Sequence, residues 1–251
     1  MAPRRDVDTI RAERKPGDPR AIAELAADAV AKSVNREWIR VAARLGYSYN
    51  FTWLGVPIIQ HPEDIVVVQE LIWRARPDLV IETGIAHGGS LLLSASILRL
   101  LGGERQVLGV DVDIRAHARE TLVTHPLAGS ISTIEGDSVS PEVFDQVVAV
   151  AHRHAARLAI LDSNHTASHV AEEIRLYSDL VTVGSYLVVM DTLIKDLPPE
   201  SSANRPCGPD DNPWVAVEAF LETDRRFVRP PEVNDKLFAS VAPGGYLLRV
   251  A

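Results

Sequence analysis

Five acidic residues stand where short apolar runs of this chain end, and their positions suggest chemistry. They are Glu82, Asp111, Asp137, Asp162 and Asp191. If the runs are parallel strands, these side chains share the rim at which open α/β sheets bind ligands. A single acid there is usually a helix cap or a solvated turn residue. Five along one rim would repel one another, so the pattern indicates that cations or hydroxyl donors occupy the space between them.

The turn between the first apolar run and the next helical segment is rich in glycine. Gly84 and Gly88 allow the backbone to approach a ligand closely. Ala86 stands where the G-x-G-x-x-G turn of dinucleotide-binding proteins has its second glycine, which argues against a pyrophosphate ligand. Asp111 follows Gly84 by about 27 positions, close to where nucleotide folds place the acid that holds ribose hydroxyls. The sequence therefore favours a nucleoside without phosphates over NAD.

A second group of residues lies at the ends of the fourth and fifth apolar runs. Asp162 and Asp191 are carboxylates on adjacent strand rims, and such a pair can share one hard cation such as Mg²⁺. His165 stands three residues after Asp162. An isolated histidine in a turn is more often a helix cap, but beside a metal pair it offers the base that activation of a hydroxyl needs. We therefore expect a metal at the two aspartates and a catalytic role for His165.

From residue 64 onward, apolar runs alternate with segments of helical period. This alternation predicts an α/β fold with a mostly parallel sheet and helices on both faces. A final antiparallel hairpin is expected to close the sheet edge. Strands are predicted at 79–81, 107–110, 131–134, 158–161, 186–190, 237–241 and 245–250, and helices near 64–75, 88–101, 115–123, 141–153 and 166–181, with Asp64 capping the first helix.

Three further segments lie outside this alternation. Apolar residues at helical spacing in 19–45 predict one or two amphipathic helices, which serve as a cap or as an oligomer contact. Residues 53–62 contain two prolines and a glycine and predict an extended connector. The proline-rich loop 192–213 directly follows a strand and is expected to be a lid. The chain is accordingly divided into an N-terminal extension and connector, 1–60, and a main domain, 61–251.

Composition excludes several classes of function. The formal net charge is −8 and no basic cluster is large enough to follow a phosphate backbone, so nucleic acid is not an expected partner. The single cysteine, Cys207, allows neither an intrachain disulfide nor a thiolate metal cluster, and it fits a cytoplasmic protein. No apolar run is long enough to cross a bilayer, so no membrane partner is expected.

The motifs together resemble those of a known family. The motifs are Trp53-Leu-Gly-Val-Pro-Ile-Ile-Gln, Pro77-Asp-Leu-Val-Ile-Glu-Thr-Gly with His-Gly-Gly-Ser90, Gly109-Val-Asp-Val-Asp-Ile114, Gly136-Asp-Ser138, Leu161-Asp-Ser-Asn-His-Thr166 with His169-Val170, Val188-Val-Met-Asp-Thr192 and Gly244-Gly-Tyr-Leu-Leu-Arg249. Over residues 50–250 the chain resembles the bacterial cephalosporin hydroxylase/rhamnosyl O-methyltransferase family, which is related to the macrolide sugar O-methyltransferases of antibiotic biosynthesis.

The resemblance implies a Rossmann-like class I methyltransferase fold with a seven-stranded sheet, S-adenosylmethionine as cofactor, and a divalent metal, Mg²⁺. Residue roles carried over by position place Glu82, Gly84 and Ser90 at the methionine end of the cofactor, Asp111 at its ribose, Asp137 and Ser138 at its adenine, Asp162 at cofactor and metal, Asp191 at the metal, and His165 as the general base. Relatives often have Glu-Asp where this chain has Met190-Asp191. One carboxylate ligand is therefore missing, and water, substrate or another residue would complete the metal site.

The expected reaction is methylation of a deoxysugar hydroxyl, a rhamnosyl one, on a glycosylated natural product. A metal lowers the pKa of the hydroxyl and His165 accepts its proton. Tyr186 or Trp214 could stack against the sugar ring, although Trp214 serves equally well as a core anchor of the following helix. Methylation of a catechol-like or small polyketide hydroxyl, and a cofactor-binding accessory subunit of a tailoring enzyme, are the alternatives. We expect a small-molecule glycoside as substrate and a homo-oligomeric protein.

Overall fold

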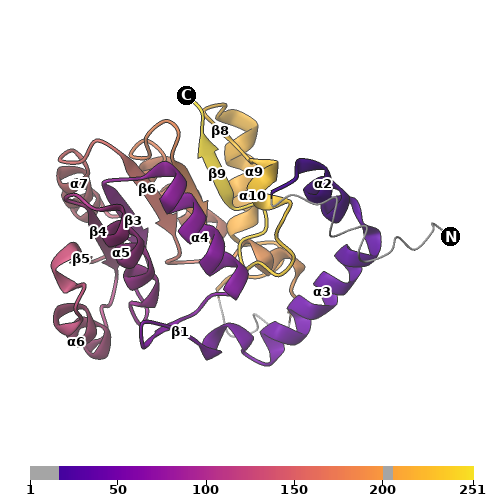
Figure 1. The fold of residues 1–251 in the computed structure, drawn as a ribbon, viewed down its shortest axis with the longest axis horizontal. Coiled ribbons are helices and arrows are strands. Elements are labelled where there is room, and N and C mark those ends of the chain that lie inside the picture. The colour runs from indigo at the N-terminus through magenta and orange to yellow at the C-terminus, as the bar shows by residue number, and fades with distance from the viewer. Residues whose placement is uncertain (1–16, 200–205) are drawn as a thin grey trace.

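A seven-stranded sheet runs through the centre of the computed structural model, which describes residues 17–199 and 206–251 (Figure 1). The strands are β3 (Leu79–Thr83), β4 (Gln106–Asp111), β5 (Ile131–Glu135), β6 (Arg157–Leu161), β7 (Tyr186–Val189), β8 (Phe227–Val228) and β9 (Tyr246–Arg249). Their order is β5-β4-β3-β6-β7-β9-β8. The first five in the chain are parallel, and β9 is antiparallel to both of its neighbours. The predicted α/β class with a mostly parallel sheet is confirmed.

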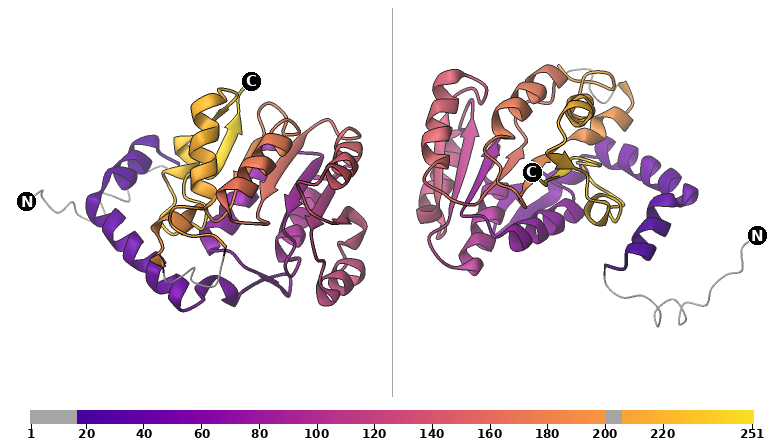
Figure 2. Two further views of the ribbon diagram at one scale, coloured as in Figure 1. Left: turned by 180° about the vertical axis from the view of Figure 1, so that it is seen from behind. Right: turned by 90° about the horizontal axis from the view of Figure 1, so that it is seen from above.

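Helices cover both faces of the sheet, as Figure 2 shows. One apolar core packs α4 (Pro62–Ala75), α5 (Gly89–Leu101), α6 (Ala116–Thr124) and α10 (Pro231–Asn234) against the sheet, and the other packs α7 (Pro141–Ala151), α8 (Ala167–Tyr177) and α9 (Pro213–Thr223). Local sequence fixes several helix starts. Ser140 and Asn212 cap α7 and α9 through their side chains, and a proline follows each cap. A short 3₁₀ turn, η2 (Ala128–Ser130), leads into β5.

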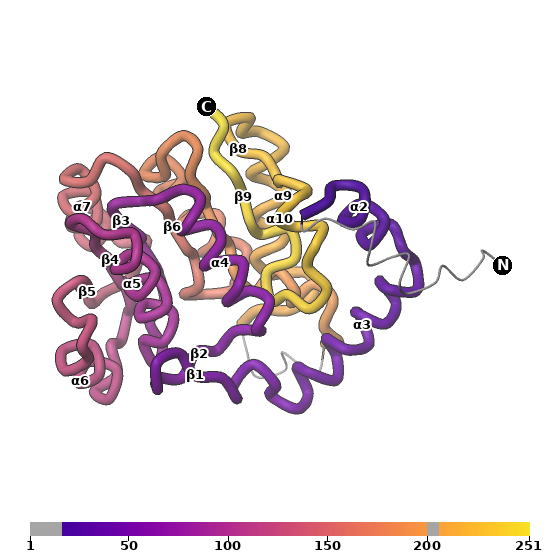
Figure 3. The backbone as a smooth tube through the Cα atoms, in the orientation of Figure 1, coloured from indigo at the N-terminus to yellow at the C-terminus, as the bar shows by residue number. Residues whose placement is uncertain are grey.

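The N-terminal part of the described chain adds two helices at the side of the sheet opposite β5, and a small hairpin beneath it (Figure 3). Its elements are α2 (Pro19–Ala27), α3 (Ala29–Arg44), the 3₁₀ turn η1 (Tyr47–Asn50), β1 (Phe51–Trp53) and β2 (Val56–Ile58). The expected extended connector is therefore partly wrong. Leu54 and Gly55 both adopt positive φ, 49° and 88°, which is the geometry that closes a two-residue hairpin. The hairpin is held against α5 by the indole N–H of Trp53, which donates to Ser96 Oγ.

The predicted strand at 237–241 is wrong, although an antiparallel pair does close the sheet. That pair is β8 with β9. Backbone N–H groups of Phe238 and Ala239 donate to Glu63 Oε2 at 2.7 and 2.9 Å. Since a carboxylate takes the donors that a neighbouring strand would need, this segment remains a loop.

Asp64 does not cap α4 as predicted, because the helix begins at Pro62. Its carboxylate is buried and accepts hydrogen bonds from Ser240 Oγ (2.6 Å), the Tyr246 hydroxyl (2.6 Å) and the Val241 N–H (2.8 Å). Asp64 therefore ties the first turn of α4 to the loop before β9 and to β9 itself.

The loop predicted over 192–213 is only partly irregular. It opens with a buried 3₁₀ turn, η3 (Thr192–Asp196), in which Thr192 Oγ1 donates to the Pro243 carbonyl. It closes with a bridge between Gly208 and Asp211 ahead of α9. Residues 200–205, on which the lid prediction also falls, lie outside the described residues. Across the described chain, helices are too short or too polar to traverse a bilayer.

Candidate active site

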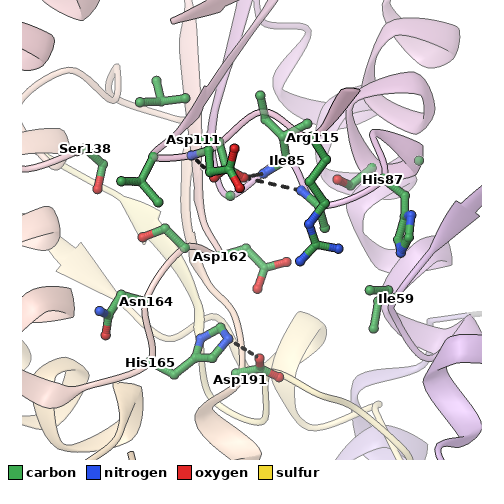
Figure 4. A pocket seen from close by; sticks show the side chains of 18 of the residues that line it. Ile59, Ile85, His87, Asp111, Arg115, Ser138, Asp162, Asn164, His165 and Asp191 are labelled. Carbon is green, nitrogen blue, oxygen red and sulfur yellow. Dashed lines mark hydrogen bonds and ion pairs between the residues drawn. The ribbon is translucent and has the colours of Figure 1, made fainter. Parts of the chain in front are cut away.

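A pocket of about 740 Å³ opens at the carboxyl ends of β3, β4 and β6, where the sequence predicted ligand binding (Figure 4). Its wall includes eight of the residues predicted for the site, which are Gly84, Ser90, Asp111, Asp137, Ser138, Asp162, His165 and Asp191. The sheet therefore brings the predicted cofactor and metal residues into one cavity. Glu82, Tyr186 and Trp214 are absent from this wall.

The glycine turn after β3 is in close contact with the loop after β6. Gly84 has φ +87°, and a Cβ atom at this position would collide with the carbonyl oxygen of Asp162. Only glycine fits both the conformation and the space. Asp111 holds the next part of the turn, since its Oδ2 accepts the Ile85 N–H at 2.7 Å and its Oδ1 accepts the Asp113 N–H at 3.0 Å. The turn is thereby preorganised beside the acid predicted to hold a ribose.

Glu82 lies behind the pocket wall, within β3, and is fully buried. Its Oε1 accepts a hydrogen bond from Ser90 Oγ, whereas Oε2 has no hydrogen-bond partner among the described residues. Burial raises the pKa of Glu82 to about 8, and the bond from Ser90 opposes that shift. Glu82 is thus mostly protonated at neutral pH unless a cation comes close to it.

Asp162, His165 and Asp191 form one cluster whose ligand atoms all lie within 4.8 Å of one another. Asp162 follows β6, and His165 precedes α8. Asp191 adopts a left-handed backbone conformation, φ +56°, two residues after β7. His165 Nε2 lies 3.1 Å from Asp191 Oδ2. Because a carboxylate only accepts, this contact is attractive when Nε2 carries the proton, which leaves Nδ1 of a neutral ring as the proton acceptor.

The electrostatics of this cluster favour a cation. Burial raises the pKa of Asp162 well above its usual value, and the negative charges of Asp191 and Glu82 raise it further. No side chain or N–H of the described chain donates to the Asp162 carboxylate. Two carboxylates at this separation, with the His165 imidazole beside them, suit a divalent ion, which would hold the acids in their charged form. The donor set therefore fits a metal.

Met190, which stands where relatives often have a glutamate, does not face this cluster. Its side chain is 1% exposed and packs in the apolar core that α4 and α5 form with one face of the sheet. Its N–H donates to the Leu161 carbonyl. Met190 therefore contributes packing, and the third protein atom near the two aspartates is the imidazole of His165.

The two aromatic residues predicted to stack on the acceptor lie elsewhere. Tyr186 is the first residue of β7, at the amino end of the strand, where it is buried and its hydroxyl receives a hydrogen bond from Arg74. Two cations lie over the ring of Trp214, with Lys195 Nζ at 2.9 Å and Arg229 Cζ at 4.4 Å from its centroid. Its ring is therefore part of the packing around α9. Neither residue lines the pocket.

Several residues of the wall were given no role by reasoning from the sequence. They are Tyr49, Pro57, Ile58, Ile59, Gln60, His87, Arg115, Asn164, His169, Pro206 and Cys207, among others. Five of these come from the segment 49–60, which was read as part of an extension and connector. His87 lies within the His-Gly-Gly-Ser90 motif and Arg115 directly follows the motif that ends at Ile114, so their polarity beside a ligand-binding turn was a usable signal.

Comparison with known proteins identifies a family and several relatives in sequence. Residues 45–250 match the family described as Rhamnosyl O-methyltransferase/CmcI. The rhamnosyl O-methyltransferase of Mycobacterium tuberculosis is 30% identical over 205 residues, which cover 79% of this chain and 78% of that protein. The protein of the same name from Mycobacterium leprae is 31% identical over 208 residues, or 79% and 82% of the two chains.

Solved structures share the fold. CmcI with Mg and SAM superposes with a TM-score of 0.60 at 19% identity, covering 81% of this chain and 78% of that one. The apo-structure of CmcI gives a TM-score of 0.59 at 21% identity, with 81% and 77% covered. At this level of identity the likeness establishes a common architecture, and the roles of individual side chains rest on the geometry above.

Proposed function

Because the chain belongs to the Rhamnosyl O-methyltransferase/CmcI family, we propose that it is an S-adenosylmethionine-dependent O-methyltransferase that uses a divalent cation. Its acceptor is a rhamnosyl or other deoxysugar hydroxyl of a glycosylated natural product. One observation carries the proposal. The carboxylate–imidazole cluster of Asp162, His165 and Asp191 opens into the same pocket as the Gly84 turn and Asp111.

The cofactor half of the pocket fits an uncharged nucleoside joined to an amino acid. Asp111 keeps acceptor capacity for ribose hydroxyls, since a carboxylate has more acceptor sites than the backbone donors it receives here. Gly84 lets a ligand approach the backbone where any side chain would be excluded. Buried Glu82 accepts a hydrogen bond from Ser90 Oγ and so fixes the orientation of a residue that lines this part of the pocket. The cofactor, when bound, supplies an electrophilic methyl group.

The metal half prepares the acceptor. A divalent cation bound at Asp162 and Asp191 would lower the pKa of a sugar hydroxyl and orient it towards the methyl group. In the mechanism that we propose, His165 Nδ1 then accepts the hydroxyl proton, while Nε2 keeps its hydrogen bond to Asp191 and fixes the orientation of the ring. Asp191 thereby positions the base as well as serving the cation.

The names of the curated relatives favour a sugar over a catechol. Both relatives cited above are rhamnosyl O-methyltransferases, and the chain covers more than three quarters of each. The same cluster of acids would also serve a vicinal diol of another kind. Direct competition between the two acceptor classes therefore tests the finer part of the proposal.

The N-terminal extension, 1–60, and the catalytic domain, 61–251, are also proposed divisions of the chain, and we propose that the enzyme is a homo-oligomer. The side of α3 that faces away from the core supports this, because Val30 and Val34 are 72% and 54% exposed. Light scattering at several concentrations would show the assembly.

The decisive experiment measures transfer of a labelled methyl group. The protein is incubated with labelled S-adenosylmethionine, Mg²⁺ and either rhamnosylated natural products or catechols, with and without a chelator. We expect transfer to the rhamnosides that depends on the metal. Transfer to catechols alone would refute the sugar assignment. Full transfer in excess chelator, with no metal found by elemental analysis, would refute the metal mechanism.

A further inference from the structure

Behind the pocket wall, a buried carboxylate organises two serine hydroxyls. Glu173, on α8, has a fully buried side chain. Its Oε1 accepts hydrogen bonds from Ser138 Oγ at 2.6 Å and from Ser163 Oγ at 2.7 Å. Both serines line the pocket, the first after β5 and the second after β6. A single carboxylate oxygen therefore fixes two pocket hydroxyls that come from different loops.

Two further side chains complete this serine–glutamate network. His169 Nε2 lies 3.2 Å from Ser138 Oγ, 3.3 Å from Ser163 Oγ and 3.6 Å from Glu173 Oε1. The Tyr177 hydroxyl donates to the Ser138 carbonyl at 2.9 Å. The second oxygen of Glu173, Oε2, has no hydrogen-bond partner among the residues of the described chain. A buried carboxylate oxygen without a partner is costly, so the network is not optimised for stability alone.

The direction of these hydrogen bonds determines what the serines can offer a ligand. A serine hydroxyl has one proton, and an ionised carboxylate can only accept. Ser138 and Ser163 therefore both point their protons at Glu173. His169 offers at most one N–H at Nε2. That N–H can donate to only one of the three nearby oxygens, which are Ser138 Oγ, Ser163 Oγ and Glu173 Oε1. Lone pairs of the hydroxyls remain for the pocket, so these two hydroxyls accept hydrogen bonds from a ligand and do not donate them.

The position of the network indicates which part of the ligand it meets. Figure 4 shows Ser138 on the far side of Asp111 and Asp162 from His87. If Asp111 holds the ribose and the methyl group faces the cluster of Asp162 and Asp191, the base is left on the Ser138 side. This step rests on the proposed function. An adenine base presents its exocyclic amino group as a donor, whereas a 6-oxo purine presents a carbonyl acceptor at the same position.

We propose that Glu173 is a positioning residue that sets the hydrogen-bond polarity of the base subsite, so that Ser138 and Ser163 accept from the 6-amino group of adenine and exclude a 6-oxo base. The site thus selects an adenosyl cofactor over an inosyl one. The carbonyl oxygen of a 6-oxo base would face the serine lone pairs with its own lone pairs. Its exclusion therefore does not require a tight steric fit.

The test is calorimetric binding of S-adenosylhomocysteine and S-inosylhomocysteine to the intact protein. We expect the wild type to prefer the adenosyl compound by about 10–100-fold, the value of one or two hydrogen bonds gained or opposed. In Glu173→Gln the amide N–H₂ donates to a serine, which frees that serine's proton to meet a carbonyl. The preference should then fall towards unity through tighter binding of the inosyl compound, an outcome that a general loss of structure would not produce.

Glu172→Gln is the matched control, because Glu172 is adjacent in sequence but pairs with Arg175 on the surface. It should keep the wild-type preference. If Glu173→Gln does not fold, Ser163→Ala tests the same point by weakening only the adenosyl compound several-fold. An unchanged preference in a folded Glu173→Gln, or no preference in the wild type, would overturn the inference. Failure of the wild type to bind either compound would instead refute the proposed cofactor.

Discussion

Two aspartates of this protein have opposite surroundings, Asp64 buried in the core and Asp162 half-buried in the pocket wall, and the contrast separates a structural acid from a functional one. Asp64 accepts hydrogen bonds from the hydroxyls of Ser240 and Tyr246 and from a backbone N–H. Asp162 receives no such bond from the described chain, and its nearest charged neighbours include Asp191. The first acid is satisfied by the protein itself, whereas the second is left for a cation.

The effects on pKa point the same way. Burial raises the pKa of both carboxyls. At Asp64 the donors of Ser240, Tyr246 and Val241 oppose that rise, and at Asp162 the charges of Asp191 and Glu82 add to it. The residue type alone therefore does not distinguish the two roles. The number of donors that the chain directs at the carboxylate does.

The largest effect is expected from Asp162→Asn. Turnover should fall by on the order of 10³-fold or more, because the cation that acidifies the acceptor is lost. Binding of S-adenosylhomocysteine should persist, and the metal-free protein should be at least as stable as the wild type, since a repulsion between carboxylates is removed. Methyl transfer, calorimetry and thermal melts measure the three quantities. Asp145→Asn, on the exposed side of α7, is the control. A large loss of stability would show that Asp162 is a structural acid like Asp64.

His165→Ala should lower turnover by about 10²–10⁴-fold, which is the usual value of a positioned general base. Affinity for the metal, measured by calorimetry, should remain close to wild type, because the two aspartates hold the ion. Loss of metal binding together with activity would show instead that the imidazole is the third ligand in the place left by Met190.

Asp64→Ala tests the structural side of the comparison. It leaves the Tyr246 hydroxyl and the Val241 N–H buried without a partner and the Ser240 hydroxyl proton without an acceptor, so the free energy of unfolding should fall by about 3 kcal/mol or more. Urea denaturation gives this value, and the metal affinity of the folded protein should not change. Weaker metal binding with unchanged stability would contradict the assignment of Asp64.

Asp111→Ala sharpens the comparison with an intermediate case, since this carboxylate is partly occupied by the N–H groups of Ile85 and Asp113. We expect affinity for S-adenosylhomocysteine to fall by about 10–100-fold, or 1.5–3 kcal/mol for bonds to a charged group. Calorimetry measures it. Unchanged affinity would remove Asp111 from the cofactor site.

The smallest expected effect is a pH dependence at Glu82. Its folded pKa of about 8 exceeds the ordinary value of 4.5, so the folded state binds the extra proton between these pH values. Its contribution to stability is therefore complete below the ordinary pKa and is lost as pH rises through about 8. The difference in unfolding free energy between the wild type and Glu82→Gln should change by at least about 1 kcal/mol over that range. A constant difference would contradict a buried, neutral Glu82.

Much of the site was predictable because its residues follow strands, and the carboxyl ends of parallel strands meet at one rim. Asp111, Asp162 and Asp191 needed only that rule to be placed together. The prediction that Tyr186 stacks on the acceptor was wrong because it ignored at which end of the strand this residue lies. Tyr186 begins β7 and Asp191 follows its end, so the strand itself separates them.

The remaining errors share another cause, which is contact between segments distant in sequence. Residues 237–241 have a strand-like pattern, but Glu63, far earlier in the chain, takes their N–H donors. Tyr49 and Gln60 reach the pocket because a small hairpin folds beneath the sheet. No local pattern encodes such contacts, and Glu173 likewise resembles any inward-facing helix residue until its two serine partners are known.

The contact between Gly84 and the Asp162 carbonyl also constrains how this enzyme can evolve. Since even one methyl group at position 84 would push the cofactor turn and the metal loop apart, neither loop can drift without the other. Within 49–60, Pro57 is tied to the same turn, because a Cβ atom at Gly89 would collide with the Pro57 carbonyl oxygen, whereas Tyr49 lines the pocket with 59% of its surface exposed. New acceptor preferences are therefore more accessible to natural or laboratory selection at Tyr49, while the two halves that perform the transfer are inherited as one unit.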